Sequence, residues 1–224
     1  METTAYRYRL TFCKEESVRF TSHLDLHRAW ERTFRRAGLP LAYRQGFNPR
    51  PRINIGSALP LGYTSKAELL DFWLEEELDT KTIARALTRA QAPGLPVREV
   101  RRIETRQPAL QAQINSASYL VRLDDPPPGL LIQTTVDGLM NAASLPRERR
   151  GKSYDLRPLI ETLLVKREGD AVQLEMTLSA REAATGRPGE VLRAMDLDPA
   201  CAHIQRTKLI ISKSPFSWRW RSSG

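Results

Sequence analysis

Periodic apolar residues predict the same order of strands and helices twice along this chain, and this repetition restricts the fold more than any other feature of the sequence. In residues 1–106 the order is strand, helix, strand, strand, helix, strand. Residues 107–212 repeat that order, with matching elements about 105–112 positions later. The break after the first helix also recurs, as Ala37-Gly38-Leu39-Pro40 and then as Ala143-Ser144-Leu145-Pro146. The pattern therefore favours a duplicated βαββαβ unit.

A βαββαβ stretch has the order of a split-βαβ unit, in which two helices cover one face of an antiparallel sheet. We therefore expect an α+β fold of tandem ferredoxin-like units, with antiparallel sheets and helices on one face. The first unit spans residues 1–106 and the second spans residues 107–212. Residues 105–113 are polar, contain Pro108 and predict a linker, and residues 213–224 predict a partly disordered C-terminal tail.

The boundaries of the predicted elements follow from the apolar pattern and from the glycines and prolines between them. The strands are expected at 5–12, 53–55, 67–74, 96–104, 116–123, 153–165, 171–179 and 203–212, and the helices at 22–37, 80–92, up to 144, and at 188–195. Ser22 and Asp25 have the spacing of a capping box at the start of the first helix. The arginines of that helix lie mostly off its apolar stripe, so we expect them to face solvent.

The charge of the chain is concentrated in one window. The chain carries 35 Lys and Arg against 26 Asp and Glu, a net charge of +9 at pH 7. Residues 19–52 hold eight arginines, with only Asp25 and Glu31 as acids, so about two-thirds of the net charge lies there. Such a concentration is typical of a protein that binds a polyanion. The alternative is the generally basic surface of an arginine-rich chain.

The most distinctive segment is Tyr43-Arg44-Gln45-Gly46-Phe47-Asn48-Pro49-Arg50-Pro51-Arg52. Its arginines and aromatic residues suit phosphate contacts combined with base stacking, the pairing that binds single-stranded nucleic acid. The alternative is a packed Ω-loop in which Phe47 anchors the segment to the core. A second basic loop, with Arg149, Arg150 and Lys152, occupies the equivalent position in the second unit.

Catalytic and cofactor-binding sequence motifs are absent, so we expect no cofactor. His23 and His27 are four positions apart, but no further ligand pattern accompanies them, and we expect no metal site. A metal-independent ribonuclease needs little more than a His and a nearby Lys or Tyr, which leaves His23 with Lys14 or Tyr43 as the catalytic candidate. No apolar run is long enough to span a membrane and residues 1–7 lack a secretory signal, so we expect a cytoplasmic protein without membrane contact.

Four segments of the first half resemble the radical SAM-linked (radical SAM-associated) family, a bacterial domain of unknown function. They are Phe20-Thr21-Ser22-His23-Leu24-Asp25-Leu26, Arg35-Arg36-Ala37-Gly38-Leu39-Pro40, Gly46-Phe47-Asn48-Pro49-Arg50-Pro51-Arg52-Ile53 and Ala58-Leu59-Pro60-Leu61-Gly62. Two later segments are also similar, Tyr154-Asp155-Leu156-Arg157-Pro158-Leu159-Ile160 and Arg187-Pro188-Gly189-Glu190-Val191-Leu192. The resemblance implies a stand-alone accessory protein that acts beside a radical SAM enzyme. Family patterns usually read His-Pro where this chain has Asn48-Pro49-Arg50-Pro51, so a His role at position 50 is unavailable here.

These observations favour a non-catalytic RNA-binding accessory protein. The expected nucleic-acid-binding residues are Arg28, Arg32, Arg35, Arg36, Tyr43, Arg44, Phe47, Arg50, Arg52, Arg149, Arg150 and Lys152. One alternative is a protein-interaction module that docks on a radical SAM enzyme. The other is a metal-independent endoribonuclease that uses His23.

Overall fold

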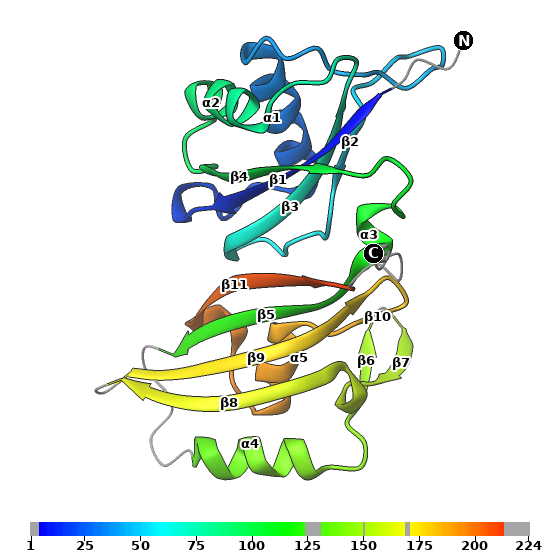
Figure 1. Ribbon diagram of the computed structural model, residues 1–224. Coiled ribbons are helices and arrows are strands. Elements are labelled where there is room, and N and C mark those ends of the chain that lie inside the picture. The colour runs from blue at the N-terminus through cyan, green and yellow to red at the C-terminus, as the bar shows by residue number, and fades with distance from the viewer. Residues whose placement is uncertain (1–4, 124–130, 150, 169–170, 213–224) are drawn as a thin grey trace, which may run out of the picture.

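The computed structural model describes residues 5–123, 131–149, 151–168 and 171–212, and its main elements follow the predicted order (Figure 1). The first unit consists of β1 (Tyr6–Lys14), η1 (Glu16–Val18), α1 (His23–Arg36), β2 (Ile53–Ile55), β3 (Thr64–Leu74), α2 (Thr80–Ala90) and β4 (Val97–Ile103). The second consists of α3 (Leu110–Gln113), β5 (Ile114–Leu123), α4 (Ile132–Asn141), β6 (Pro146–Arg149), β7 (Lys152–Asp155), η2 (Arg157–Leu159), β8 (Ile160–Glu168), β9 (Ala171–Arg181), β10 (Ala184–Thr185), α5 (Pro188–Ala194), η3 (Pro199–Cys201) and β11 (Ala202–Ile211). The predicted α+β class is confirmed.

Both units arrange their main strands in the same spatial order. In the first unit the order is β4-β1-β3-β2, and in the second it is β11-β5-β9-β8, with antiparallel pairing throughout each. We interpret each unit as ferredoxin-like on this topology. The two sets of strands are joined, because β11 pairs in parallel with the start of β3, Gln205 opposite Thr64 and Arg206 opposite Ser65. In the described residues the main strands of both units thus form one nine-stranded sheet where we expected separate sheets, and β6 and β7 form a second, two-stranded sheet.

Each unit has its own hydrophobic core. In the first, Tyr8, Leu10 and Phe12 of β1 alternate inward and pack against α1 and α2. The second core gathers β5, β8, β9, α4 and α5, and Leu59 of the first unit also belongs to it. Figure 1 shows α1 and α2 above the strands and α4 below them, so the two cores lie on opposite sides of the connected sheet.

Helix α1 begins and ends as the sequence predicts. The Ser22 hydroxyl accepts the backbone N–H of Asp25 at 3.1 Å and donates to the Asp25 carboxylate at 2.7 Å. Leu26, Trp30 and Phe34 of its apolar stripe are buried against the sheet. Gly38 follows the helix at φ +66°, a backbone conformation that glycine adopts without steric cost.

The predicted linker covers the second face of the first unit's sheet. Arg7 and Arg9 alternate with the apolar residues of β1, yet both are buried and share the carboxylate of Asp71 on β3. The Arg7 guanidinium also donates to the carbonyl oxygens of Gln107 at 2.6 Å and Pro108 at 2.8 Å. This buried Arg7–Asp71–Arg9 triad therefore holds the segment between the units against the sheet.

Candidate nucleic-acid interface

The segment 43–52 forms a hairpin-like loop rooted on β3. At its base the Ala42 N–H donates to the Trp73 carbonyl at 2.8 Å and the Arg52 N–H donates to the Ala42 carbonyl at 2.8 Å. Further out the Arg44 N–H donates to the Arg50 carbonyl at 2.8 Å. Gly46 turns the tip at φ +149°. The loop is thus closed by backbone bonds and projects from the sheet edge.

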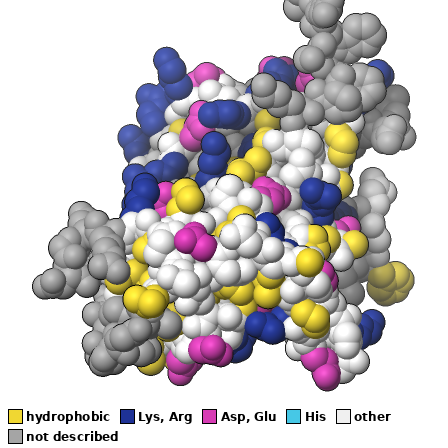
Figure 2. All heavy atoms as spheres, turned by 90° about the horizontal axis from the view of Figure 1, so that it is seen from below, with side chains coloured by type: hydrophobic (Ala, Val, Ile, Leu, Met, Phe, Trp, Pro, Cys, Tyr) yellow, Lys and Arg dark blue, Asp and Glu magenta, His cyan; other side chains and the backbone are white. Residues whose placement is uncertain are grey.

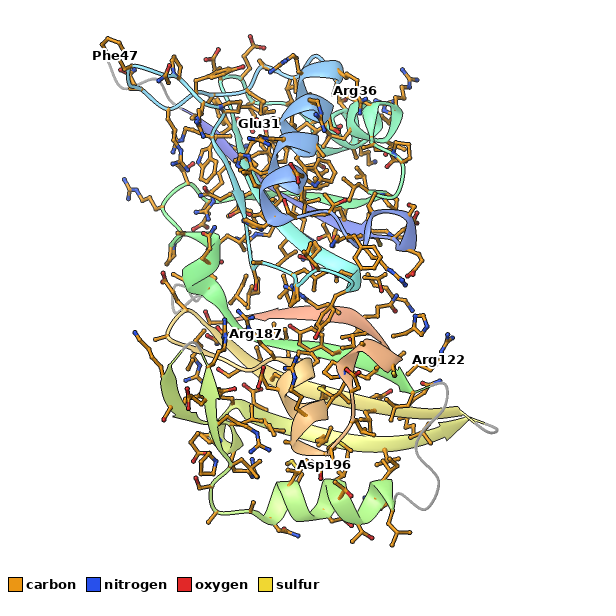
Figure 3. The ribbon with its side chains drawn as sticks, turned by 180° about the vertical axis from the view of Figure 1, so that it is seen from behind. Glu31, Arg36, Phe47, Arg122, Arg187 and Asp196 are labelled. Carbon is orange, nitrogen blue, oxygen red and sulfur yellow. The ribbon has the colours of Figure 1, made fainter. Side chains whose placement is uncertain are left out.

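Phe47 occupies the tip of this loop and is fully exposed, at 105 % of its reference area. Figure 3 shows its side chain at the outermost end of the loop, pointing away from the protein. The alternative in which Phe47 anchors a packed Ω-loop to the core is therefore wrong. Exposure leaves unused the roughly 1.5–3 kcal/mol that burial of a Phe side chain contributes. Tyr43, at the base, is half exposed.

The three arginines of the loop have different environments. Arg50 is exposed. Arg44 is also exposed, and its guanidinium donates to the Asn54 side-chain oxygen at 3.0 Å, which orients it beside the loop. The Arg52 guanidinium lies 4.8 Å from the ring centre of Trp73, so it contributes to the packing of the loop base. Arg44 and Arg50 are the two side chains best placed to meet a phosphate.

The predicted arginines of α1 form a separate surface. Arg28 pairs with Asp25 at 3.4 Å, and Arg36 donates to the Ala90 carbonyl at the end of α2 at 2.6 Å, while Arg32 and Arg35 are exposed. In Figure 3, Glu31 lies between Arg36 and the Phe47 loop. The structure therefore divides the basic window of the sequence into two surfaces. One is the 43–52 loop, and the other is the α1 stripe, which consists of Arg28, Arg32, Arg35 and Arg36.

The basic residues of the second unit line a cleft at the junction of the units. Arg149 and Lys152 come from the β6–β7 hairpin, and they face a cleft of about 850 Å³ that also contains Tyr119, Tyr154 and Arg187. Arg187 lies at the level where the two units meet (Figure 3). Sequence reasoning missed these last three residues, although Tyr154 and Arg187 open family-like segments. Arg150 lies outside the described residues.

Figure 2 shows the face that α4 occupies, viewed from below. Basic side chains gather toward one edge of this view, and acidic and apolar side chains are scattered over the rest. Helix α4 itself contains Asp137 and no Lys or Arg. Helix α4 therefore adds no positive charge to the basic features described above.

The two histidines of α1 differ in environment: His23 is exposed at the start of the helix, and His27 is half-buried. Burial and the neighbouring His27 lower the pKa of His23, and Glu68 opposes that shift. His27 lies 3.4 Å from Glu31 and 3.4 Å from the Ile53 carbonyl. Lys14, the proposed partner of His23, is buried and donates to the Arg19 carbonyl at 2.7 Å. Within the described ranges, no cluster of three or more His, Cys, Asp or Glu could hold a metal, and no helix is long and apolar enough to cross a membrane.

A family sequence pattern matches residues 7–188, which is most of the chain. The protein belongs to DUF2344, described as uncharacterized protein conserved in bacteria. No curated protein matches it. Solved structures that match include an unknown protein from Galdieria sulphuraria, which is 10% identical. The match covers 93% of this chain and 100% of the other, with a TM-score of 0.27. Another is described as a candidate glycine cleavage system transcriptional repressor and is 10% identical. That match covers 93% of this chain and 99% of the other, with a TM-score of 0.25.

The DUF2344 match includes all three basic features described above, the arginines of α1 among them. It contains the whole 43–52 loop and extends through the cleft as far as Pro188, where the match ends. The two solved structures are too dissimilar in fold to inform the function of any of these features.

Proposed function

We propose that this DUF2344 protein binds single-stranded RNA without cleaving it, and that the 43–52 loop makes the contact. The observation that carries the proposal is the fully exposed Phe47 at the tip of a backbone-bonded loop, with Arg44 and Arg50 beside it. An aromatic face exposed next to guanidiniums supplies base stacking and phosphate contacts together. Single strands suit it because their bases are unstacked and accessible.

The α1 stripe supports the same proposal as a secondary, sequence-independent surface. Arg32 and Arg35 are exposed on the face of α1 opposite the core. Exposed guanidiniums on the same unit raise the local positive potential and speed the encounter with a polyanion. We expect the loop to supply the stacking and the direct phosphate contacts, and the stripe to add a weaker, longer-range attraction.

Phe47→Ala tests the proposal by fluorescence anisotropy with a short labelled single-stranded RNA. Loss of one stacked base costs about 1–3 kcal/mol, so affinity should fall roughly 5- to 150-fold. Phe20→Ala is the matched control, because Phe20 is also exposed but belongs to another surface. Unchanged affinity in Phe47→Ala, or an equal loss in both variants, would refute stacking by the loop.

A second candidate function is docking on a radical SAM enzyme, which the family-like segments suggest. The favouring observation is the exposure of three large apolar side chains, Phe20, Leu24 and Leu61. The Phe20 ring packs near Gly62, 3.6 Å from where a Cβ would stand, which places Phe20 beside Leu61. Co-purification of a radical SAM protein that survives nuclease and high salt, and is lost in Phe20→Ser, would support docking. Loss of the partner on nuclease treatment would exclude it.

A further inference from the structure

The cleft at the junction of the units has the dimensions of a small-molecule site. Its volume of about 850 Å³ falls within the range of roughly 300–1,000 Å³ typical of ligand pockets. One wall is the 57–60 loop of the first unit, and the others are the β6–β7 hairpin and the 180–188 segment of the second unit. Three of the family-like segments therefore meet at this one cleft.

The cleft combines cations with aromatic and apolar surface. Arg149, Lys152 and Arg187 supply positive charge, and Tyr154 with Leu159 supplies a flat apolar surface. Burial raises the pKa of Tyr154 and the nearby Glu190 raises it further, while Arg149, Arg147 and Arg187 act against that shift.

Two acidic residues, Asp155 and Glu182, also line the cleft. They differ in whether the carboxylate is already hydrogen-bonded within the hairpin or is exposed to solvent. The Asp155 carboxylate accepts the N–H of Leu145 at 2.7 Å and of Arg157 at 2.9 Å, so it is part of the hairpin's own structure. Glu182 is exposed at the rim. A carboxylate at the rim is suited to accept a hydroxyl or amine of a ligand rather than to meet its phosphate. The acidic residues therefore leave the cationic side of the cleft intact.

A buried arginine fixes the wall contributed by the first unit. Arg206 is fully buried on β11, and its guanidinium donates to the carbonyl oxygens of Ser57 at 3.4 Å and Ala58 at 3.1 Å. It also lies 5.9 Å from the ring centre of Tyr119 and 3.3 Å from the Glu68 carboxylate. These contacts link both units at the cleft and keep its wall in place before a ligand arrives, which lowers the cost of binding.

We propose that this cleft binds a nucleotide, with the phosphate held by Arg187, Arg149 and Lys152 and the base lying against Tyr154. The volume is much larger than a phosphate ion needs, and its aromatic and apolar side suits a planar group attached to the anion. The nucleotide is either free or part of an RNA chain, and both present the same chemistry. The site uses none of the 43–52 loop residues, so it is independent of the proposed function.

Isothermal titration calorimetry with adenosine and uridine 5′-monophosphates tests the proposal. We expect Arg187→Gln to weaken binding about tenfold or more, since a charge-assisted bond to phosphate is lost. Lys152→Gln, at an exposed position of the hairpin, should weaken it severalfold. Arg193→Gln is the matched control, because Arg193 is an exposed arginine on α5 that pairs with Glu190 outside the cleft lining, and it should bind as the wild type does.

Absence of binding by both monophosphates at millimolar concentration would overturn the proposal, as would equal affinity in wild type, Arg187→Gln and Lys152→Gln. Inorganic phosphate that binds as tightly as the monophosphates would also overturn it, because the base would then contribute nothing. Phe47→Ala should bind monophosphates like the wild type, which separates failure at this cleft from failure at the loop. Displacement of the monophosphate by a short oligoribonucleotide identifies RNA as the source, and retention identifies the free nucleotide.

Discussion

Asp71→Asn should destabilise the protein strongly. The Asp71 carboxylate is fully buried and accepts hydrogen bonds from Arg7 at 2.6 and 3.0 Å and from Arg9 at 2.7 and 3.0 Å. An amide keeps the shape but removes the charge, and neither guanidinium can deprotonate to compensate. Removing one partner of a buried ion pair costs about 3–5 kcal/mol. Because Arg7 retains the Gln107 and Pro108 carbonyls, we expect about 3 kcal/mol rather than the upper value.

Urea unfolding followed by tryptophan fluorescence measures this change. The background should carry Trp218→Phe and Trp220→Phe, so that the signal comes from Trp30 and Trp73 of the first unit. Glu175→Gln is the control, since it breaks an exposed pair with Lys166 and should cost no more than about 1 kcal/mol. A loss below about 1 kcal/mol for Asp71→Asn would refute the reasoning, because the buried triad would then contribute no more than a surface pair.

Three further predictions concern the junction, the histidine and one turn. Arg206→Met leaves the buried Glu68 without its guanidinium and should lower the free energy of unfolding by about 3–5 kcal/mol. The double variant Arg206→Met/Glu68→Met should recover most of the lost stability, and thermal denaturation measures both variants. The folded chain protonates His23 less readily than the unfolded chain, so stability should fall as pH drops below about 6.5, and His23→Gln should flatten that fall in urea titrations at several pH values. Gly94→Ala, at φ +77° with a Cβ 2.5 Å from the Ser17 hydroxyl, should cost about 1–3 kcal/mol by urea unfolding.

Local pattern predicted most of the elements because their apolar faces are periodic. Helix α1 and strand β1 match expectation to within a few residues, since their stripes and caps are encoded in adjacent positions. The connection between the sheets could not be predicted in the same way. The short β2 pairs only with Leu70–Phe72 of β3, which leaves the start of that long strand open for β11. An open sheet edge is a property of the assembled fold and has no local signature.

The candidate site residues also differ in whether a local sequence pattern could predict them. The exposure of Arg32 and Arg35 follows from helix periodicity, and the composition of the 43–52 loop marks it directly. Charged side chains usually lie at the surface, so local pattern could not predict that Arg7 and Arg206 are buried. Their burial depends on carboxylates of another strand, Asp71 for Arg7 and Glu68 for Arg206. The cleft residues Tyr119, Tyr154 and Arg187 come from segments brought together by the second unit's fold, so no spacing in the sequence joins them.

The salt dependence of single-stranded RNA affinity tests the role of the 43–52 loop most directly. Each phosphate contact contributes about 0.7 to the slope of log affinity against log salt, so Arg44→Gln/Arg50→Gln should flatten the slope by about 1.4. Arg85→Gln/Arg89→Gln removes the same charge from exposed positions of α2 and should leave the slope unchanged. Equal slopes for wild type and the loop variant, or equal flattening in both variants, would contradict binding by the loop.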